Sequence, residues 1–415
     1  DNDVSIHVEE NNQGIIISGV FSEINDITPR DKKGLLQFTG LNKNDRTVEA
    51  LYRMNIATNA AAIEAAVKDY SVPPQNLLYA DKDGQFGYIA AGSVPKRSSD
   101  GFYAADNKVW QGMMAQTPRM KNPDAGVIMT ANQAIVDDKT CKQFSCAFAR
   151  DWAEPYRAMR LEEWIADAFA KNEPLDVTQA SAAMLDVTSV AAKRYLPVML
   201  QSMKGKEPFE KEILAALSRW DAQMLRDKPE PLIYHAWLDA LMAKQFSTTY
   251  TSDVMWPRMW ALEQQPISRD VMRSAFEEAI EGLKERHGKH WKSWRWGDEH
   301  IARLAHPVWS RVPVIKHLTS LATATDGDAH TLRRAAPLDF TKPFADEHGA
   351  GYRGVYDLAN PAQSLFMIAG GQSGQLASPH YGNLRDTWNA GQFITLTGDK
   401  QELKNTGAPE LSLTP

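Results

Sequence analysis

The sequence has few cysteines, no long apolar run and no excess of basic residues. No apolar run approaches the ~20 residues that a membrane-spanning helix needs, so we expect no membrane span. Lysine and arginine number 46 against 52 aspartates and glutamates, and the resulting net charge of −6 argues against nucleic acid as a partner. The composition, 43% hydrophobic and 24% charged, is that of a globular protein, and its length suggests about two or three domains.

The only two cysteines, Cys141 and Cys146, lie close together in a polar stretch. Their spacing suits a small disulfide in an oxidising compartment, and two unrelated thiols are the alternative. No second cysteine or histidine pair completes a zinc site. Two histidine pairs lack the spacing and flanking acid of a metalloprotease helix, so we interpret them as surface or structural residues: His287 with His290, and His300 with His306.

Motifs for common enzyme classes are also missing. There is no P-loop and no dinucleotide fingerprint. Gly371-Gln372-Ser373-Gly374-Gln375 lacks the last glycine of a nucleophile elbow and no helical pattern follows it, so Ser373 is predicted to be a turn hydroxyl. Asp81-Lys82-Asp83-Gly84 lacks the downstream acid of a calcium loop and is predicted to be a turn. The chain therefore carries no obvious nucleophile of its own.

The first ninety residues have a β-rich pattern interrupted by two helices. Short apolar runs predict strands at 5–8, 14–17 and 35–38. A helix is expected to follow with Asp45 or Thr47 as its cap, and a second helix to run from 60 to 70. Pro73 and Pro74 end the second helix. Two apolar runs around the Asp-Lys-Asp-Gly turn predict a hairpin over 75–90.

A polar corner follows the apolar run at 126–130. Val127, Ile128 and Met129 predict a short strand that is buried on both faces. Asn132 then stands where this strand would leave the core. A carboxamide fixed there can donate a hydrogen bond to an oxygen that becomes negative during acyl transfer. The alternative is a turn asparagine that bonds its own backbone.

The pattern after Pro155 is helical. Pro155 itself is placed to begin a helix, because proline is favoured in the first turn. Arg157 and Arg160 lie near that start, where cations oppose the helix dipole, so we expect an acidic group or a site beside them. A buried stripe is predicted on this helix at Met159, Leu161, Trp164, Ile165 and Phe169. Further helices are predicted from 176 to 286, with breaks at Pro197, Pro208, Pro229, Pro231, Pro257 and Pro266.

Thirteen short strings occur in the order found in one enzyme family. They are Asp45-Arg46-Thr47, Gln75-Asn76, Tyr79-Ala80-Asp81, Gly87-Tyr88-Ile89-Ala90, Trp110-Gln111-Gly112, Thr130-Ala131-Asn132, Tyr156-Arg157-Ala158, Trp296-Gly297-Asp298-Glu299-His300, His306-Pro307, Gly327-Asp328, Tyr352-Arg353, Gly371-Gln372-Ser373-Gly374 and Ser378-Pro379-His380-Tyr381. Each string is short, but together they span nearly the whole chain. Because these strings occur in this order, the chain resembles the penicillin acylases and acyl-homoserine lactone acylases, which are N-terminal-nucleophile amidohydrolases.

The resemblance implies an α+β fold, the four-layer αββα sandwich of the N-terminal-nucleophile hydrolases with a helical insertion. Residues 1–175 would form part of the sandwich with the oxyanion-hole segment, 176–286 the helical insertion, and 287–415 the C-terminal part of the sandwich. In this family a precursor cuts itself into α and β chains, and the new N-terminal serine of the β chain is the nucleophile, with its own α-amino group as base. The chain begins at Asp1, so the resemblance makes it the C-terminal part of a β chain whose nucleophile lies outside it.

The resemblance also implies roles for two residues. Asn132 matches the oxyanion-hole carboxamide, and Arg157 matches the arginine near the nucleophile, with Arg160 as the alternative one turn later. Some members bind structural calcium through an acid in the loop after this asparagine, where Asp137 and Asp138 lie, but we assign no metal ligand. No cofactor is expected for the chemistry.

The implied activity is hydrolysis of the linear amide of an acylated amine. The substrate would be a β-lactam side chain or an N-acyl-homoserine lactone, and the partners the α chain and the N-terminal part of the β chain. A periplasmic location is implied, and there we expect Cys141 and Cys146 to form a disulfide. The alternative is a non-catalytic binding or structural fragment that retains the fold.

Overall fold

The computed structural model describes residues 7–11, 14–96, 110, 112–135, 152–173, 175–201, 203–246, 267–338, 342–407 and 412. The chain divides into two compact units, one of Asp1–Thr130 with Ala134–Trp152 and one of Ala131–Gln133 with Ala153–Pro415. Among the described residues, no helix combines the length and the apolar composition that a bilayer crossing requires. The domain limits expected from the sequence, at 175 and 286, stay a prediction.

The first unit starts with a small antiparallel sheet of order β1-β2-β3. Its strands are β1 (Glu10–Asn11), β2 (Gly14–Ile16) and β3 (Leu35–Leu36), with a short helix α1 (Ser22–Ile27) between β2 and β3. The strands expected near 14 and 35 are confirmed in shortened form, whereas α1 was not predicted. Of the run at 5–8, residues 5 and 6 lie outside the described residues, and His7 and Val8 are not in a strand.

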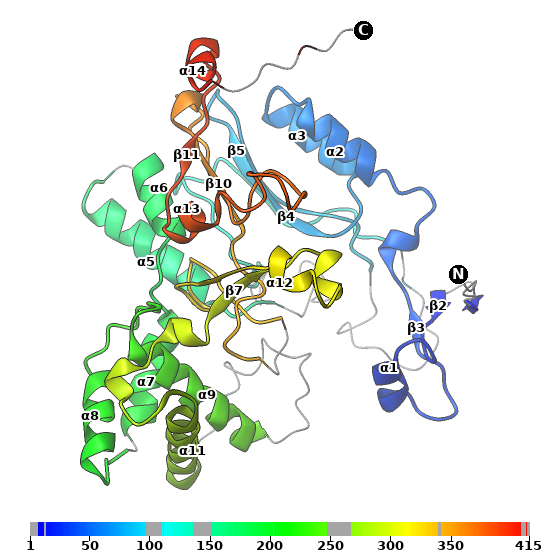
Figure 1. Ribbon diagram of the computed structural model, residues 1–415. Helices are drawn as coiled ribbons and strands as arrows, with labels where there is room; N and C mark the ends of the chain where they lie inside the picture. The colour runs from blue at the N-terminus through cyan, green and yellow to red at the C-terminus, as the bar shows by residue number, and fades with distance from the viewer. Residues whose placement is uncertain are drawn as a thin grey trace. The chain divides into compact units, whose positions relative to one another are not determined.

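Two helices and a second antiparallel sheet follow in the first unit. They are α2 (Thr47–Asn55), α3 (Ala60–Ala66) with a 3₁₀ turn η2 (Val67–Asp69), β4 (Gln75–Ala80), β5 (Phe86–Ala91) and β6 (Arg119–Lys121). Figure 1 shows α2 and α3 side by side. The predicted cap at Asp45 or Thr47 is wrong by one residue, because the N-cap of α2 is Arg46, which makes no side-chain cap hydrogen bond. Asp45 Oδ1 still accepts hydrogen bonds from Thr47 N (3.2 Å) and Thr47 Oγ1 (2.7 Å) just before the helix.

The hairpin predicted over 75–90 is confirmed as β4 and β5. Leu77 pairs with Ile89 across the two strands, and the apolar side chains of both pack against Val67. In the connecting turn Gly84 has a φ of +79°, which suits glycine, and Asp81 Oδ1 accepts from the backbone of Gln85 at 2.9 Å. The Asp-Lys-Asp-Gly string is therefore a turn, as predicted.

The strand expected at 126–130 is wrong. Val127, Ile128 and Met129 are only half-buried and form no strand. The two edges of β5 are taken by β4 and by Arg119–Lys121, so this run has no edge of β5 left to pair with. The run is instead tied at its end by a hydrogen bond of 3.1 Å from Asn76 Nδ2 to Thr130 Oγ1.

Helices make up the first half of the second unit. They are α5 (Tyr156–Ala170), α6 (Val177–Met184), α7 (Val190–Gln201), α8 (Pro208–Leu217), α9 (Pro229–Phe246) and α11 (Arg269–His287). Figure 1 shows α7, α8, α9 and α11 gathered around one core. At its centre Trp237 is fully buried, contacts the ring of Phe276 edge-on and donates to Met272 O at 3.2 Å. The helical pattern predicted for 176–286 is confirmed in its described part.

The buried stripe predicted on α5 is only partly correct. Phe169 is 51% exposed, and Met159, Leu161, Trp164 and Ile165 are half-buried. The fully covered positions are Tyr156, Ala158 and Ala168. The hydroxyl of Tyr156 hydrogen-bonds that of Tyr195 on α7, so the face that is buried is set by the neighbouring helix and not by the largest apolar side chains.

The break predicted at Pro197 is wrong, because α7 continues through it. Proline removes one backbone donor from a helix, but Leu196 and Met199 on either side are buried in the helical core and keep the turn in place. Pro208 and Pro229 do stand at helix starts, as expected. Pro257 and Pro266 lie outside the described residues.

We expect Pro197→Ala to raise the free energy of unfolding by about 1–3 kcal/mol, because it restores the backbone donor inside α7 and removes the ring. Pro197 is exposed, so no packing is lost. The measurement is chemical denaturation followed by circular dichroism. Pro208→Ala is the matched control, since a proline in the first turn costs the helix no hydrogen bond, and this change is expected to have little effect. Equal effects of the two changes would contradict this account.

The last part of the second unit holds two small antiparallel sheets. One pairs β7 (Ile301–Leu304) with β8 (Leu321–Ala324), and the other has the order β11-β10-β9 with β9 (Tyr352–Val355), β10 (Leu365–Ile368) and β11 (Ile394–Thr395). Short helices accompany them: α12 (Lys316–Thr319), α13 (Arg385–Asn389) and α14 (Lys400–Asn405). Four 3₁₀ turns complete the part: η3 (Trp291–Ser293), η4 (Trp296–Asp298), η5 (Trp309–Arg311) and η6 (Pro361–Gln363).

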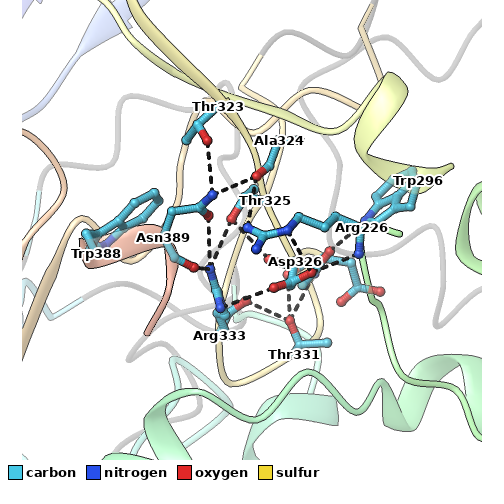
Figure 2. Close-up of polar contacts among 12 residues, drawn as sticks. Arg226, Trp296, Thr323, Ala324, Thr325, Asp326, Thr331, Arg333, Trp388 and Asn389 are labelled. Carbon is cyan, nitrogen blue, oxygen red and sulfur yellow. Dashed lines mark hydrogen bonds and ion pairs between the residues drawn. The ribbon is translucent and has the colours of Figure 1, made fainter. Parts of the chain in front are cut away.

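A buried polar network fixes the loop that follows β8. Figure 2 shows Asn389, at the end of α13, donating to Thr323 Oγ1 at 3.0 Å and to Ala324 O at 2.8 Å. Arg333 donates to Asn389 O at 2.7 Å and pairs with Asp326 at 3.3 Å. The loop between Asp326 and Arg333 is therefore held at both of its ends, which places Asp328 and His330 within it.

Candidate functional site

Asn132 is held in an unusual backbone conformation. Its φ is +67°, in the left-handed region, which asparagine enters more readily than most residues. Its carbonyl accepts from Ala153 N at 2.9 Å, and the preceding residue, Ala131, donates its N–H to Gln133 Oε1 at 2.7 Å. Asn132 is exposed, so its side chain is accessible while its backbone is fixed.

Arg157 fixes the side chain of Asn132. It lies in the first turn of α5, and its Nη2 donates to Asn132 Oδ1 at 2.9 Å. A guanidinium has only donors, so the carboxamide must turn its oxygen toward Arg157. The Nδ2 end, with its two N–H donors, is then the end left for another acceptor. The structure thus brings the two predicted site residues into direct contact, although their roles stay predictions.

The surroundings of Arg157 are electropositive. Burial and, to a smaller extent, the charge of the nearby Arg334 lower the pKa of Arg157 to about 10, against the opposing charge of Glu154. Burial and the charges of Arg334 and Arg157 also lower the pKa of His348. Arg157 remains a cation at neutral pH, and its charge beside Oδ1 makes the Asn132 carboxamide a stronger hydrogen-bond donor at Nδ2.

Arg160, the alternative to Arg157, does not contact Asn132. Its Nε and Nη2 bind both carboxylate oxygens of Asp186, at 3.0 and 2.7 Å, and its Nη1 binds Glu163 at 2.8 Å. The expectation that an acidic group compensates a cation near the start of α5 is confirmed at Arg160. Because Arg160 lies about one turn further along α5 than Arg157, its side chain reaches Asp186, on the segment between α6 and α7.

Sequence reasoning missed a largely buried chain of ionisable side chains close to Arg157. Glu154 Oε2 lies 3.1 Å from His330 Nε2, His330 N donates to Asp328 Oδ1 at 2.7 Å, and Asp328 Oδ2 lies 3.3 Å from His235 Nε2. Burial raises the pKa of Asp328, but the contact with His235 and the charge of His330 outweigh it and bring the pKa to about 2. Gly327-Asp328 was one of the strings of the resemblance, but no sequence signal joins Glu154 to a partner 176 positions away.

The remaining candidates are structural or fall outside the described residues. Ser373 Oγ accepts from Gln375 N at 3.1 Å, which confirms the turn hydroxyl. His300 is buried and structural, since its ring stacks on Trp296 and burial lowers its pKa to about 4. Four candidates lie outside the described residues: Asp137, Asp138, Cys141 and Cys146. In the described ranges, no group of three or more His, Cys, Asp or Glu side chains could hold a metal ion.

Comparison with known families gives a match along nearly the whole chain. The family model described as penicillin amidase matches residues 1–405. The chain belongs to the penicillin amidase family. This membership confirms the family that the ordered strings indicated.

Curated relatives carry the names of two kinds of acylase. The chain is 25% identical over 416 residues to the penicillin acylase 2 proenzyme of Pseudomonas sp. (strain SE83), covering 93% of this chain and 51% of that protein. It is 23% identical over 434 residues to the acyl-homoserine lactone acylase QuiP of Pseudomonas syringae pv. syringae (strain B728a), covering 90% of this chain and 50% of that protein. The chain thus spans about half the length of the curated relatives it matches.

A solved structure supports the fold. The thermostable penicillin G acylase from Alcaligenes faecalis superimposes with a TM-score of 0.69 at 14% identity, over the whole of this chain and 79% of that one. The α+β fold of the N-terminal-nucleophile hydrolases that the resemblance implied is therefore confirmed, and the named strands of the described residues pair antiparallel.

Proposed function

We propose that the whole protein hydrolyses the linear amide of an acylated amine, and that Asn132 supplies an oxyanion donor. The observation that carries this proposal is the contact between Arg157 Nη2 and Asn132 Oδ1, which leaves the Nδ2 donors for a substrate oxygen. An oxyanion donor has to be held in place before the reaction starts. The left-handed backbone of Asn132, tied by Ala153 N, supports this.

The reaction would follow the route of N-terminal-nucleophile hydrolases. A serine outside these residues attacks the amide carbon, and its proton passes to its own α-amino group. The carbonyl oxygen becomes an alkoxide and accepts a hydrogen bond from Asn132 Nδ2. The C–N bond then breaks, the amine leaves with the proton, and water releases the acyl group from the serine. Arg157 keeps the Asn132 carboxamide in orientation throughout and neutralises part of the charge.

The substrate class and the setting are part of the same proposal. The names of the relatives support a β-lactam side chain or an N-acyl-homoserine lactone as substrate. The nucleophile would come from the N-terminal part of the β chain, and the α chain would be the partner. We propose that the protein is periplasmic and that its chemistry needs no cofactor. We also propose that a structural calcium ion binds near the loop after Asn132.

The test is an assay of the protein purified from cells that express the complete gene. We expect release of a primary amine from N-phenylacetyl or glutaryl amides, or from N-acyl-homoserine lactones of 4 to 12 carbons, measured with an amine-reactive dye. Intact mass and N-terminal sequencing of the same sample should show a chain that starts with serine. Absence of release from every substrate, together with a chain that starts at Asp1, would favour a non-catalytic protein that retains the fold.

A further inference from the structure

Both contacts that hold Asn132 come from one five-residue segment, 153–157. Ala153 N binds the Asn132 carbonyl at 2.9 Å, and Arg157 Nη2 binds the Asn132 side chain at 2.9 Å. The segment is the connection into α5, and Pro155 at its centre makes no side-chain cap. The contacts that hold segment 153–157 therefore decide how firmly the Asn132 carboxamide is held.

Glu154 anchors this segment in the interior. Its side chain is 3% exposed, and its Oε2 lies 3.1 Å from His330 Nε2, whose side chain is 13% exposed. The second oxygen, Oε1, is buried and accepts no hydrogen bond from the described residues. A buried carboxylate needs a partner, and His330 is the partner that the described residues give to Glu154.

His330 is itself held on its other sides. Its backbone N–H donates to Asp328 Oδ1 at 2.7 Å, and its ring meets the ring of Tyr156 edge-on at 5.5 Å. Asp328 in turn contacts His235 on α9. The pair thus joins the start of α5 to the fixed loop after β8 and to the helical core.

We propose that the buried ion pair of Glu154 and His330 is a positioning element, which holds the 153–157 segment and, through Ala153 and Arg157, the Asn132 carboxamide. The inference deepens the proposed function and rests on it for the consequence in turnover. Glu154 and His330 are not catalytic residues in this account, because neither contacts the Nδ2 end of Asn132, to which the substrate oxygen would bind. They act through Arg157.

The charges around the pair agree with this arrangement. Burial lowers the pKa of His330, but the hydrogen bond and charge of Glu154 and the charge of Asp328 outweigh it, so the pKa stands above its ordinary value. The groups that face the pair are Arg157 from α5, Asp328 from the loop and, beyond Asp328, His235 from α9. The protonated His330 therefore contributes its full stabilisation of the fold at pH values below the pKa that it has in the unfolded chain. This stabilisation is lost as the pH rises through the higher pKa that it has in the folded protein.

The test compares Glu154→Gln and His330→Gln with the unchanged protein, purified from the complete gene. Glutamine keeps the shape of Glu154 and removes its charge. In protein labelled with ¹⁵N-asparagine, we expect both changes to move the side-chain NH₂ resonance of Asn132, which its loss in Asn132→Ala identifies. We also expect kcat to fall by about tenfold with little change in KM, the cost of a misplaced group. The double variant should lose no more than either single one.

Glu299→Gln is the matched control. His287 Nε2 lies 2.6 Å from Glu299 Oε1, which also accepts from Arg286 Nε at 2.9 Å, so Glu299 is likewise paired with a histidine. Among the hydrogen bonds and ion pairs of the described residues, Glu299 has none with Asn132, Arg157 or Glu154. We expect the Asn132 resonance and kcat to stay unchanged in it. An Asn132 resonance that does not move in Glu154→Gln overturns the positioning role, whether or not the protein is active. If the unchanged protein is inactive but the Asn132 resonance moves in Glu154→Gln, the proposed function is wrong and the positioning role stands.

Discussion

Asn132→Ala is expected to lower kcat by about a hundredfold or more, because removal of one oxyanion donor costs on the order of 3 kcal/mol of barrier. The substitution removes the Nδ2 donors and leaves Arg157 without its acceptor. KM should change little, since a donor to the oxyanion acts mainly in the transition state and not on the bound substrate. The measurement is steady-state kinetics on the best substrate of the amine-release assay.

The backbone of Asn132 requires two controls. Alanine is less suited than asparagine to a φ of +67°, so part of the effect could come from strain. Asn132→Gly removes the carboxamide without that strain and should lose the same activity. Asn172, at the end of α5, is also exposed and left-handed, with a φ of +55°, and Asn172→Ala should retain full activity. Near-normal kcat in Asn132→Gly would remove Asn132 from the mechanism.

Trp296→Ala is expected to lower the free energy of unfolding by about 3–5 kcal/mol, the usual loss for a fully buried aromatic side chain. Trp296 is 1% exposed and lies between two histidine rings: His235 at 4.7 Å and His300 at 4.3 Å between ring centroids, both nearly parallel to it. Its Nε1 donates to Gly327 O at 3.0 Å. The change opens a cavity, removes both stacks and leaves a buried carbonyl unpaired.

Trp309→Ala separates this packing effect from the loss of a tryptophan as such. Trp309 is 43% exposed in η5, and we expect its replacement to cost about 1 kcal/mol or less. Both variants are measured by urea denaturation with far-ultraviolet circular dichroism. A loss below about 1 kcal/mol for Trp296→Ala would show that the His235–Trp296–His300 stack contributes little to stability.

Local signals in the sequence placed several elements correctly. Pro155 marked the start of α5, and the turn residues around Gly84 marked the hairpin of β4 and β5, because both depend on conformations of adjacent residues. The ordered strings indicated the family, and within it Asn132 and Arg157 as site candidates. Their contact across 25 positions could not be derived from the residues and was found only in the structure.

Tertiary structure decided where local patterns were insufficient. The run Val127–Met129 has the composition of a strand, yet it forms none, and both edges of β5 are taken by β4 and β6. Pro197 has the signal of a helix break, yet burial of Leu196 and Met199 keeps α7 continuous. In both cases the contacts made between distant parts of the chain decide the local structure, and the preference of the local sequence does not.

The sequence by itself determined the residue types of this protein's candidate site and the order in which they occur. Only the tertiary structure decided that Arg157 and not Arg160 meets Asn132, and that Glu154 is paired with His330. The physical reason is that an arginine binds whichever acceptor the path of the chain brings within reach, and here Asp186 lies beside Arg160 while Asn132 lies beside Arg157. Partners separated by 25 to 176 positions leave no periodicity in the sequence, so their meeting is fixed by the packing of whole elements.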